Sequence, residues 1–406
     1  MKKIAYILDC FPVFSETFIL REILELQRKG FKVLVMARMN TKDRPAFSEV
    51  IHSEAEKLIA EVYYFPASGT EMSRTRKAAL HLYFLLRNPA RYLRTLLFSY
   101  RADPRTFWYF KNSVFYAMKL KKAGVDHIHA HYALDSCKFA MLISMLTGIP
   151  YSFTVHAHDI FLPELSDLME EKFKHAKFVV SISEYNKSFV LKKYPAIRPD
   201  NIRIIHCGVD PSTFAPKGGT NKKVTIVSIG RLVEHKGLEY LIQACKILKE
   251  QKGFDFECRI IGNGKQRQEL EDLIQKLNLG DRVRLLGVLE QADVLEALNG
   301  ADLFVLPCVI EKSGMRDGIP VVLMEAMAME IPVVSTKVSG IPELVKDGAG
   351  ILVEPEDVRG LADAIENIFR MSETERKKMG KTGRAVVEKE FHLEKEVRKL
   401  AELFKG

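Results

Sequence analysis

Residues 317–335 read DGIPVVLMEAMAMEIPVVS, and this stretch indicates the architecture most directly. An acid, Asp317, precedes a Gly-Ile-Pro turn, and a second acid, Glu325, begins a predicted helical stretch eight residues later. The run 332–335 is short and valine-rich, which is typical of a buried strand. A loop, a helix and a strand in this order make one repeat of an α/β fold.

The polar groups of this stretch suit a ligand that carries hydroxyls and phosphate. Each carboxylate can accept several hydrogen bonds from hydroxyl groups. The backbone amides of Gly318 and Ile319 come where the start of a helix favours phosphate. A structural alternative stays open, in which Asp317 caps the helix and Glu325 pairs with a neighbouring cation.

The same strand–loop–helix rhythm extends in both directions from this stretch. Short runs rich in Ile, Val and Tyr predict strands at Lys3–Leu8, Lys32–Ala37, His127–His131, Tyr151–His156, Phe178–Ile182, Ile202–His206, Val224–Ile229, Glu257–Ile261, Val283–Leu286, Leu303–Pro307, Pro332–Ser335 and Gly350–Val353. Strands that alternate with helices predict parallel sheets covered on both faces. The two series imply two doubly wound halves, with ligands bound at the carboxyl ends of the strands, in a cleft between the halves.

A Pro-, Gly- and Lys-rich stretch separates the two series and predicts the domain boundaries. We expect an amino-terminal Rossmann-like domain over 1–210, a linker over 211–223 and a second Rossmann-like domain over 224–385. Residues 386–406 read as a carboxyl-terminal helix that packs back on the first domain.

Composition narrows the class of protein. The 406 residues are 47% hydrophobic and 28% charged, as in a folded globular chain, and no apolar run approaches membrane-spanning length. Asp9 interrupts the apolar start, which favours a buried strand over an export signal and predicts a cytoplasmic protein. The six scattered cysteines form no CxxC pair and indicate reduced thiols. The net charge of +9 calls for an anionic partner.

Two glycine turns in the second half follow predicted strands. Gly230-Arg231 and Lys236-Gly237 combine free backbone amides with an arginine and a lysine, which suits a diphosphate, although a solvated basic turn is the alternative. Gly262-Asn263-Gly264 is weaker, because a tight turn before a helix would look the same. The full GxGxxG pattern is absent, which disfavours a dehydrogenase.

These segments together resemble the donor half of the retaining glycosyltransferases of family 4, which have the GT-B fold. The matching segments are GRLVEHKG (230–237), IIGNG (260–264), ADLFVLP (301–307), DGIPVVLMEAMA (317–328), PVVST (332–336) and GIPELV (340–345). The resemblance implies that Asp317 contacts the donor sugar, that Glu325 binds the ribose, and that Arg231 and Lys236 hold the diphosphate. Gly262, Asn263, Gly318 and Ile319 complete the expected donor-binding set.

Two positions depart from the pattern of that family. Asp317 replaces the usual glutamate, so its carboxylate is one methylene shorter, which puts the identity of the sugar in doubt. Glu330 stands where the family usually has glycine, and the residues alone offer no functional account of it.

The first half carries the acceptor side. The loop FPVFSETF (11–18) follows the first strand and resembles the exopolysaccharide-building, colanic-acid-type branch of family 4. We therefore expect Ser15, Glu16 and Thr17, together with His131, on the acceptor side. Helix capping by this run is the alternative. His131 ends a strand in which alternate histidines share one face, and His156 matches the family's histidine near the reacting sugar. A zinc site among these histidines lacks a supporting motif, so no metal is expected.

Residues 74–122 are unusually basic and aromatic, with twelve lysines and arginines against one acid, Asp103, and with Trp108 among aromatic neighbours. Such a segment suits docking on an anionic membrane, where it would bring the enzyme to an acceptor on a polyprenyl diphosphate. A basic, solvated helix pair with its aromatics in the core is the alternative.

The residues and the resemblance predict one activity. We expect a retaining hexosyltransferase that moves a sugar from a nucleotide diphosphate sugar, with UDP favoured, to a glycan or lipid-linked saccharide in cell-surface polysaccharide synthesis. His156, Asp317, Arg231 and Lys236 form the expected catalytic set. The chain contains no Asp-x-Asp, so no cofactor or divalent metal is expected. An epimerase or phosphorylase on the same fold, or a non-catalytic binder of anionic lipid or nucleic acid, remains the alternative.

Overall fold

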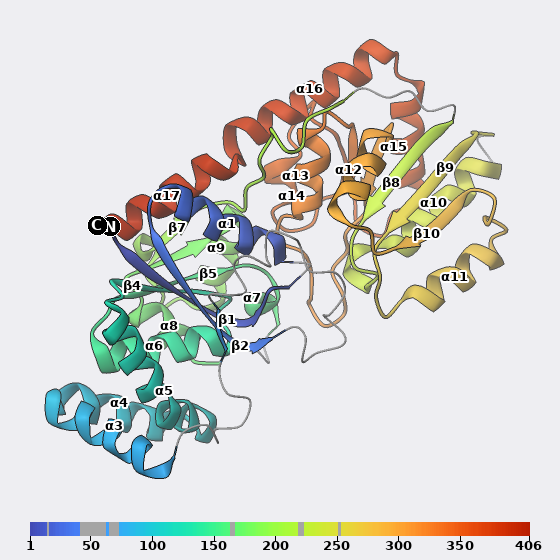
Figure 1. The fold of residues 1–406 in the computed structure, drawn as a ribbon. Helices are drawn as coiled ribbons and strands as arrows, with labels where there is room; N and C mark the ends of the chain where they lie inside the picture. The colour runs from blue at the N-terminus through green and yellow to red at the C-terminus, as the bar shows by residue number, and fades with distance from the viewer. Residues whose placement is uncertain (14–15, 41–61, 65–72, 163–166, 218–222, 251–252) are drawn as a thin grey trace. The chain divides into compact units, whose positions relative to one another are not determined.

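The computed structural model describes residues 1–13, 16–40, 62–64, 73–162, 167–217, 223–250 and 253–406 (Figure 1). The chain divides into two compact units. The first contains Met1–Ile182, Lys187–Ile205 and Val397–Gly406, and the second contains Ser183–Asn186 and His206–Glu396. Among the helices described, none is long and apolar enough to cross a membrane.

The first unit is built on a seven-stranded parallel sheet with the order β3-β2-β1-β4-β5-β6-β7. Its strands are β1 (Lys3–Phe11), β2 (Lys32–Asn40), β3 (Tyr63–Tyr64), β4 (His127–His131), β5 (Tyr151–Val155), β6 (Phe178–Ser181) and β7 (Ile202–Ile204). The strand order reverses between β1 and β4, which makes their carboxyl ends the topological switch point of this sheet. The two-residue strand β3 was not expected, because a run this short carries no periodicity.

Helices surround this sheet: α1 (Thr17–Arg28), α6 (Asp135–Thr147), α7 (His158–Phe161), α8 (Met169–His175) and α9 (Glu184–Lys193). The basic segment forms α3 (Arg74–Arg87), α4 (Pro89–Ala102) and α5 (Pro104–Ala123). The side chains of Ser73, Asn88 and Asp103 cap these three helices, each accepting a backbone N–H three residues on. The alternative interpretation of this segment as a helix pair undercounts it: the segment forms three helices, and two of the caps precede a proline in the first turn.

The second unit contains a six-stranded parallel sheet with the order β10-β9-β8-β11-β12-β13. Its strands are β8 (Val224–Ile229), β9 (Phe256–Ile261), β10 (Val283–Gly287), β11 (Leu303–Leu306), β12 (Val333–Thr336) and β13 (Ile351–Val353). Its helices are α10 (Leu238–Glu250), α11 (Arg267–Lys276), α12 (Gln291–Asn299), α13 (Val321–Ala328), α14 (Ile341–Leu344), α15 (Val358–Arg370) and α16 (Glu373–Glu390). The switch point of this sheet lies between β8 and β11.

The last helix, α17 (Leu393–Lys405), carries its carboxyl-terminal part into the first unit. Phe404 is 1% exposed there, and its ring centroid lies 5.0 Å from that of His127 and 6.3 Å from that of Phe31. Lys2 donates to the backbone carbonyl of Phe404 over 2.8 Å. The two ends of the chain are thus packed together in one unit.

Glu330 occupies a left-handed turn after α13, with a φ of 59°. Its carbonyl oxygen would lie 1.9 Å from a Cβ on Gly380 of α16, so the two backbones pack closely. This conformation favours glycine, which explains why the resembling family has glycine here. The chain thus has glutamate in place of the family's usual glycine at 330 but keeps the left-handed turn.

Candidate active site

Two glycine turns of the second unit interlock at the ends of β8 and β9. Gly230 donates its N–H to the carbonyl of Ile261 over 3.0 Å, and Leu232 donates to that of Asn263 over 2.9 Å. A Cβ on Gly262 would lie 1.9 Å from the carbonyl oxygen of Gly230. Glycine is therefore required at 262 for the packing of these turns, which the weak sequence signal left open.

Lys236 and Asp317 form an ion pair across the switch point. Lys236 follows β8, Asp317 follows β11, and the Nζ–Oδ2 distance is 2.9 Å. Cys308 lies on the other side, with its Sγ 3.3 Å from the same carboxylate oxygen. Burial by itself would raise the pKa of Asp317, but Lys236 and nearby His235 outweigh this effect and lower it to about 2. The carboxylate is therefore ionised at all physiological pH values.

These contacts decide two of the structural alternatives. α13 begins at Val321 with Pro320 at its N-cap, and no side chain in this described segment caps it. The capping alternative is wrong for Asp317, which pairs with Lys236 instead. Lys236 is buried, so the solvated-turn alternative is wrong for it, whereas Arg231 is exposed.

Glu325 lies in the middle of α13, not at its start as expected, because the helix begins four residues before it. Its residue is 6% exposed. Gly318 and Ile319 precede the N-cap, and the carbonyl of Gly318 accepts the N–H of Gly340 over 3.2 Å. The loop before α13 is therefore tied to the loop after β12.

His235, which the sequence interpretation passed over, lies between the two expected basic residues. Its Nδ1 is 2.7 Å from Oε1 of Glu311. Its residue is 4% exposed, and Nε2 is buried with no hydrogen-bond partner among the described residues. A buried, unsatisfied ring nitrogen beside the Lys236–Asp317 pair is a further candidate to bind a ligand. No motif in the sequence marks it.

In the first unit, histidines gather at the carboxyl ends of β4 and β5. The Nδ1 of His131 lies 2.9 Å from the Nε2 of His156, and the rings stack with centroids 5.2 Å apart. His127 and His129 share the hydroxyl of Ser152, at 2.7 and 2.8 Å, which confirms that alternate histidines of β4 face the same side. Phe18 packs against His156 with ring centroids 4.9 Å apart.

Glu22 of α1 completes this cluster and was not anticipated. Its Oε1 lies 3.1 Å from Nε2 of His131 and 2.5 Å from the hydroxyl of Tyr6. In the neutral form of His131, a carboxylate partner at Nε2 makes that nitrogen the donor, so Nδ1 accepts from His156. Glu22 thereby sets the tautomer of both histidines.

Burial lowers the pKa of His156 well below its ordinary value, and the charged forms of His131 and His158 would lower it further. His156 is therefore neutral at pH 7. Glu22, His129 and His131 have possible ligand atoms within 4.8 Å of one another. Both ring nitrogens of His129 and of His131 already have hydrogen-bond partners, so the group is a hydrogen-bonded network.

Asp159 holds the two loops that carry these histidines. Its carboxylate accepts the N–H of Ala133 over 2.8 Å, of His156 over 3.1 Å and of Ala157 over 2.9 Å. The carbonyl of Ala133 accepts a hydrogen bond from Lys172 over 2.7 Å. The loop after β4 is thus held through both the backbone N–H and the backbone carbonyl of Ala133.

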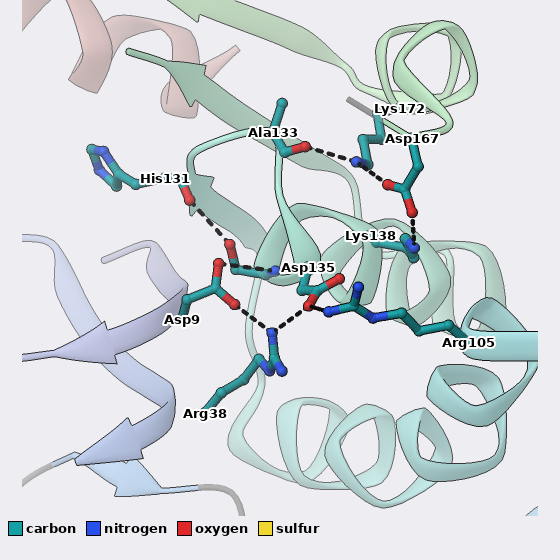
Figure 2. A network of polar contacts seen from close by, with 10 residues as sticks. Asp9, Arg38, Arg105, His131, Ala133, Asp135, Lys138, Asp167 and Lys172 are labelled. Carbon is teal, nitrogen blue, oxygen red and sulfur yellow. Dashed lines mark hydrogen bonds and ion pairs between the residues drawn. The ribbon is translucent and has the colours of Figure 1, made fainter. Parts of the chain in front are cut away.

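Figure 2 shows the ionic contacts around this loop. Lys138 and Lys172, both fully buried, share the carboxylate of Asp167. Arg38 of β2 bridges Asp9 at 2.6 Å and Asp135 at 2.9 Å, and Arg105 joins Asp135. Because a buried charge is costly unless it is paired, Lys138 and Lys172 both need Asp167. The contacts of Arg38 tie the start of α6, at Asp135, to β1 and β2. The sequence marks Asp9 only as a polar interruption of the first strand, and the ion pair with Arg38 explains its presence there.

The acceptor-side run lies only partly within the described residues. Ser15 lies outside them. Glu16 occupies the N-cap position of α1 without a side-chain capping bond, and Thr17 begins the helix. The capping alternative is therefore wrong for Glu16.

Comparison with known proteins identifies the family. The model for Glycosyltransferase Family 4 matches residues 15–213, and that for glycosyl transferases group 1 matches residues 211–386. The chain is 31% identical to the Escherichia coli protein WcaL, described as a colanic acid biosynthesis glycosyltransferase, over the whole of both chains. The chain belongs to glycosyltransferase family 4.

Two further proteins are similar to this family 4 glycosyltransferase. It is 39% identical over half of each chain to the amylovoran biosynthesis glycosyltransferase AmsK of Erwinia amylovora. Anabaena HepE, solved in complex with UDP-glucose, covers 99% of both chains with a TM-score of 0.70 and 18% identity. The expected GT-B fold of two Rossmann-like domains is confirmed.

Proposed function

We propose that this glycosyltransferase moves a hexosyl group from a UDP-sugar to a saccharide or polyprenyl-diphosphate-linked acceptor, with retention of configuration, in exopolysaccharide synthesis. The observation that carries the proposal is the Lys236–Asp317 pair at the β8/β11 switch point, beside the interlocked glycine turns. The names of WcaL and AmsK support a polysaccharide product, and the UDP-glucose of the HepE complex supports the nucleotide.

Each residue has a chemical role in this proposal. Arg231 and Lys236 stabilise the charge that grows on the departing diphosphate as the bond to the anomeric carbon breaks. Asp317 accepts hydrogen bonds from the sugar, and Glu325 accepts them from the ribose. Gly262 and Asn263 line the nucleotide side.

The acceptor side completes the proposed reaction. The acceptor oxygen attacks the anomeric carbon from the face that the diphosphate leaves, while its proton passes to the departing diphosphate. His156 positions the sugar through a neutral ring nitrogen. The basic residues replace a divalent metal, so transfer proceeds in the presence of a chelator.

We also propose that the enzyme works in the cytoplasm and docks on the inner face of the membrane through α3, α4 and α5. Exposed apolar side chains on these helices support docking: Leu82, Leu86, Leu93, Leu97, Tyr100 and Trp108. The surrounding arginines and lysines would attract anionic lipid. Tyr109, Phe110 and Tyr116 are buried, so only part of the aromatic set faces outward.

Thermal shifts against UDP-, GDP- and ADP-sugars, with and without chelator, test the donor site. A sugar nucleotide at about 100 times its dissociation constant should stabilise the protein by roughly 2.7 kcal/mol. We expect a shift with UDP-sugars that persists with chelator and disappears in Glu325→Ala. Glu290→Ala, at an exposed glutamate of the same unit, should keep it. If no sugar nucleotide shifts the melting temperature, the proposed donor site is wrong.

Arg231→Ala tests the electrostatic role. Loss of one preorganised donor to developing charge should lower kcat at least about 10²-fold, as at an oxyanion hole. Turnover of the UDP-sugar by the purified variant, compared with that of wild type, measures this. Near-normal kcat would contradict the role.

A further inference from the structure

A basic cavity lies in the first unit, away from the histidine cluster and among helices that the proposed reaction does not use. It has a volume of about 220 Å³. Its lining comes from α4, from the end of α6 and from the end of α8, and consists of Arg91, Arg94, Ser144, Met145, Gly148 and His175. The lining thus contains two arginines and a histidine, without a carboxylate. This volume could hold several water molecules, which is enough space for a phosphate group.

Arg91 is held at this cavity by packing. A Cβ on Gly148 would lie 1.5 Å from its Nη1, so the guanidinium rests against the glycine that ends α6. The carbonyl end of a helix attracts a cation, which orients Arg91 without neutralising it. Among the described residues, neither Arg91 nor Arg94 has an ion pair with a carboxylate. Their charge is therefore available to an anion.

His175 closes the cavity from α8. The ring of Phe98, also on α4, packs against it edge-on with centroids 6.1 Å apart. Its Nε2 lies 3.4 Å from Oε2 of Glu171. Burial lowers the pKa of His175, Glu171 partly opposes this effect, and Arg94 adds to it. A neutral ring supplies a hydrogen bond and leaves the charge to the arginines.

The cavity borders an exposed apolar strip on the same helix. Leu93, Leu97 and Tyr100 follow the i, i+4, i+7 spacing of one helical face and are 46, 50 and 73% exposed. Arg94 and Arg101 lie along one side of this strip, and Arg91 lies beyond Arg94. An acyl chain and a phosphate would therefore meet complementary surfaces on neighbouring faces of α4, with Arg94 between them.

We propose that this α4–α6–α8 cavity binds the phosphate of an anionic lipid headgroup while the leucine strip of α4 contacts its acyl chains. Two arginine forks match phosphate geometry, and lipid supplies phosphate and apolar surface together. The proposal rests on the membrane docking proposed above and adds a defined headgroup site to it.

Vesicle binding by two matched double variants tests the site. Arg91→Gln/Arg94→Gln removes the cavity arginines, and Arg87→Gln/Arg101→Gln removes the same charge from positions on α3 and α4 outside the cavity; all four residues are exposed. Both should weaken cosedimentation with phosphatidylcholine vesicles that contain phosphatidylglycerol, by roughly fivefold for each arginine. The cavity variant should lose at least about tenfold more, because it also loses charge-assisted hydrogen bonds. Equal losses would overturn the site and leave docking intact.

Calorimetric titration with monomeric short-chain phosphatidylglycerol separates the site from membrane docking. We expect binding by wild type and by the Arg87→Gln/Arg101→Gln variant, and none by the cavity variant. Binding of inorganic phosphate with equal affinity would overturn the lipid assignment. The UDP-sugar thermal shift should be the same in all three proteins, so a lost shift would indicate damage to the fold.

Discussion

At the scale of single residues, Asp317 stays ionised although it is largely buried, because Lys236 lies 2.9 Å away. The side chain of Asp317 is one methylene shorter than the glutamate usual in the family. Its carboxylate contacts Lys236 and Cys308. The short side chain keeps the charge close to the end of β11. The residue proposed to contact the sugar, Asp317, and a residue proposed to contact the diphosphate, Lys236, are therefore partners in one ion pair.

Asp317→Asn should change the pH dependence of stability. The pKa of Asp317 is about 2 in the folded protein and near 3.9 unfolded, so its stabilisation is present above about pH 4 and is lost as pH falls towards 2. The difference in unfolding free energy between wild type and variant should shrink by about 2 kcal/mol over that range.

Urea unfolding followed by circular dichroism at a series of pH values measures this difference, since the single tryptophan lies in the other unit. Asp347→Asn, at an exposed acid of the same unit, serves as the control. Parallel curves for wild type and Asp317→Asn would rule out the stabilising pair.

Glu330→Gly should stabilise the protein. An L-residue pays about 1 kcal/mol to hold the left-handed conformation that Glu330 adopts at φ 59°, and glycine avoids this penalty. The melting temperature and urea midpoint should rise accordingly. Glu330→Ala keeps the Cβ and should bring no such gain, so a gain in both variants would attribute the effect to the side chain.

At the scale of elements, the two turns after β8 and β9 form one interlocked structural unit. Each turn was recognisable from its glycines, but their interlocking was not, because Gly230 and Gly262 are 32 positions apart and only the strand pairing brings them together. The same applies to Lys236 and Asp317, which adjacent parallel strands deliver to one edge. The edge of the sheet that carries the candidate site could be predicted, and the pairings between its residues could not.

Gly262→Ala should disrupt the packing between these two turns. Its Cβ would meet the carbonyl oxygen of Gly230 at 1.9 Å, and a φ of 137° is strained for alanine, so we expect a loss of about 1–3 kcal/mol. The UDP-sugar thermal shift should weaken with it. Gly280→Ala has open space around the new Cβ and should leave both unchanged. A stable Gly262→Ala protein with a normal shift would show that the turns tolerate separation.

At the scale of the whole molecule, the carboxyl-terminal residues stabilise the amino-terminal unit. Phe404→Ala should destabilise that unit by about 3–5 kcal/mol, because it removes a fully buried ring from contact with His127 and Phe31. Tryptophan fluorescence reports on this unit through Trp108. Lys399→Ala, at an exposed position of the same helix, is the control. Unchanged unfolding in Phe404→Ala would mean that the helix end contributes no stability.

The sequence by itself determined the two parallel α/β units, the family and the switch-point edge of the second unit, because strand period, glycine turns and motif order are local properties. Tertiary structure decided which groups meet there. His235, Glu22 and Asp159 act through partners 76, 109 and 26 residues away, and no local pattern encodes such distances. The cavity between α4, α6 and α8 arises in the same way, because packing assembles its arginines and histidine from separate helices.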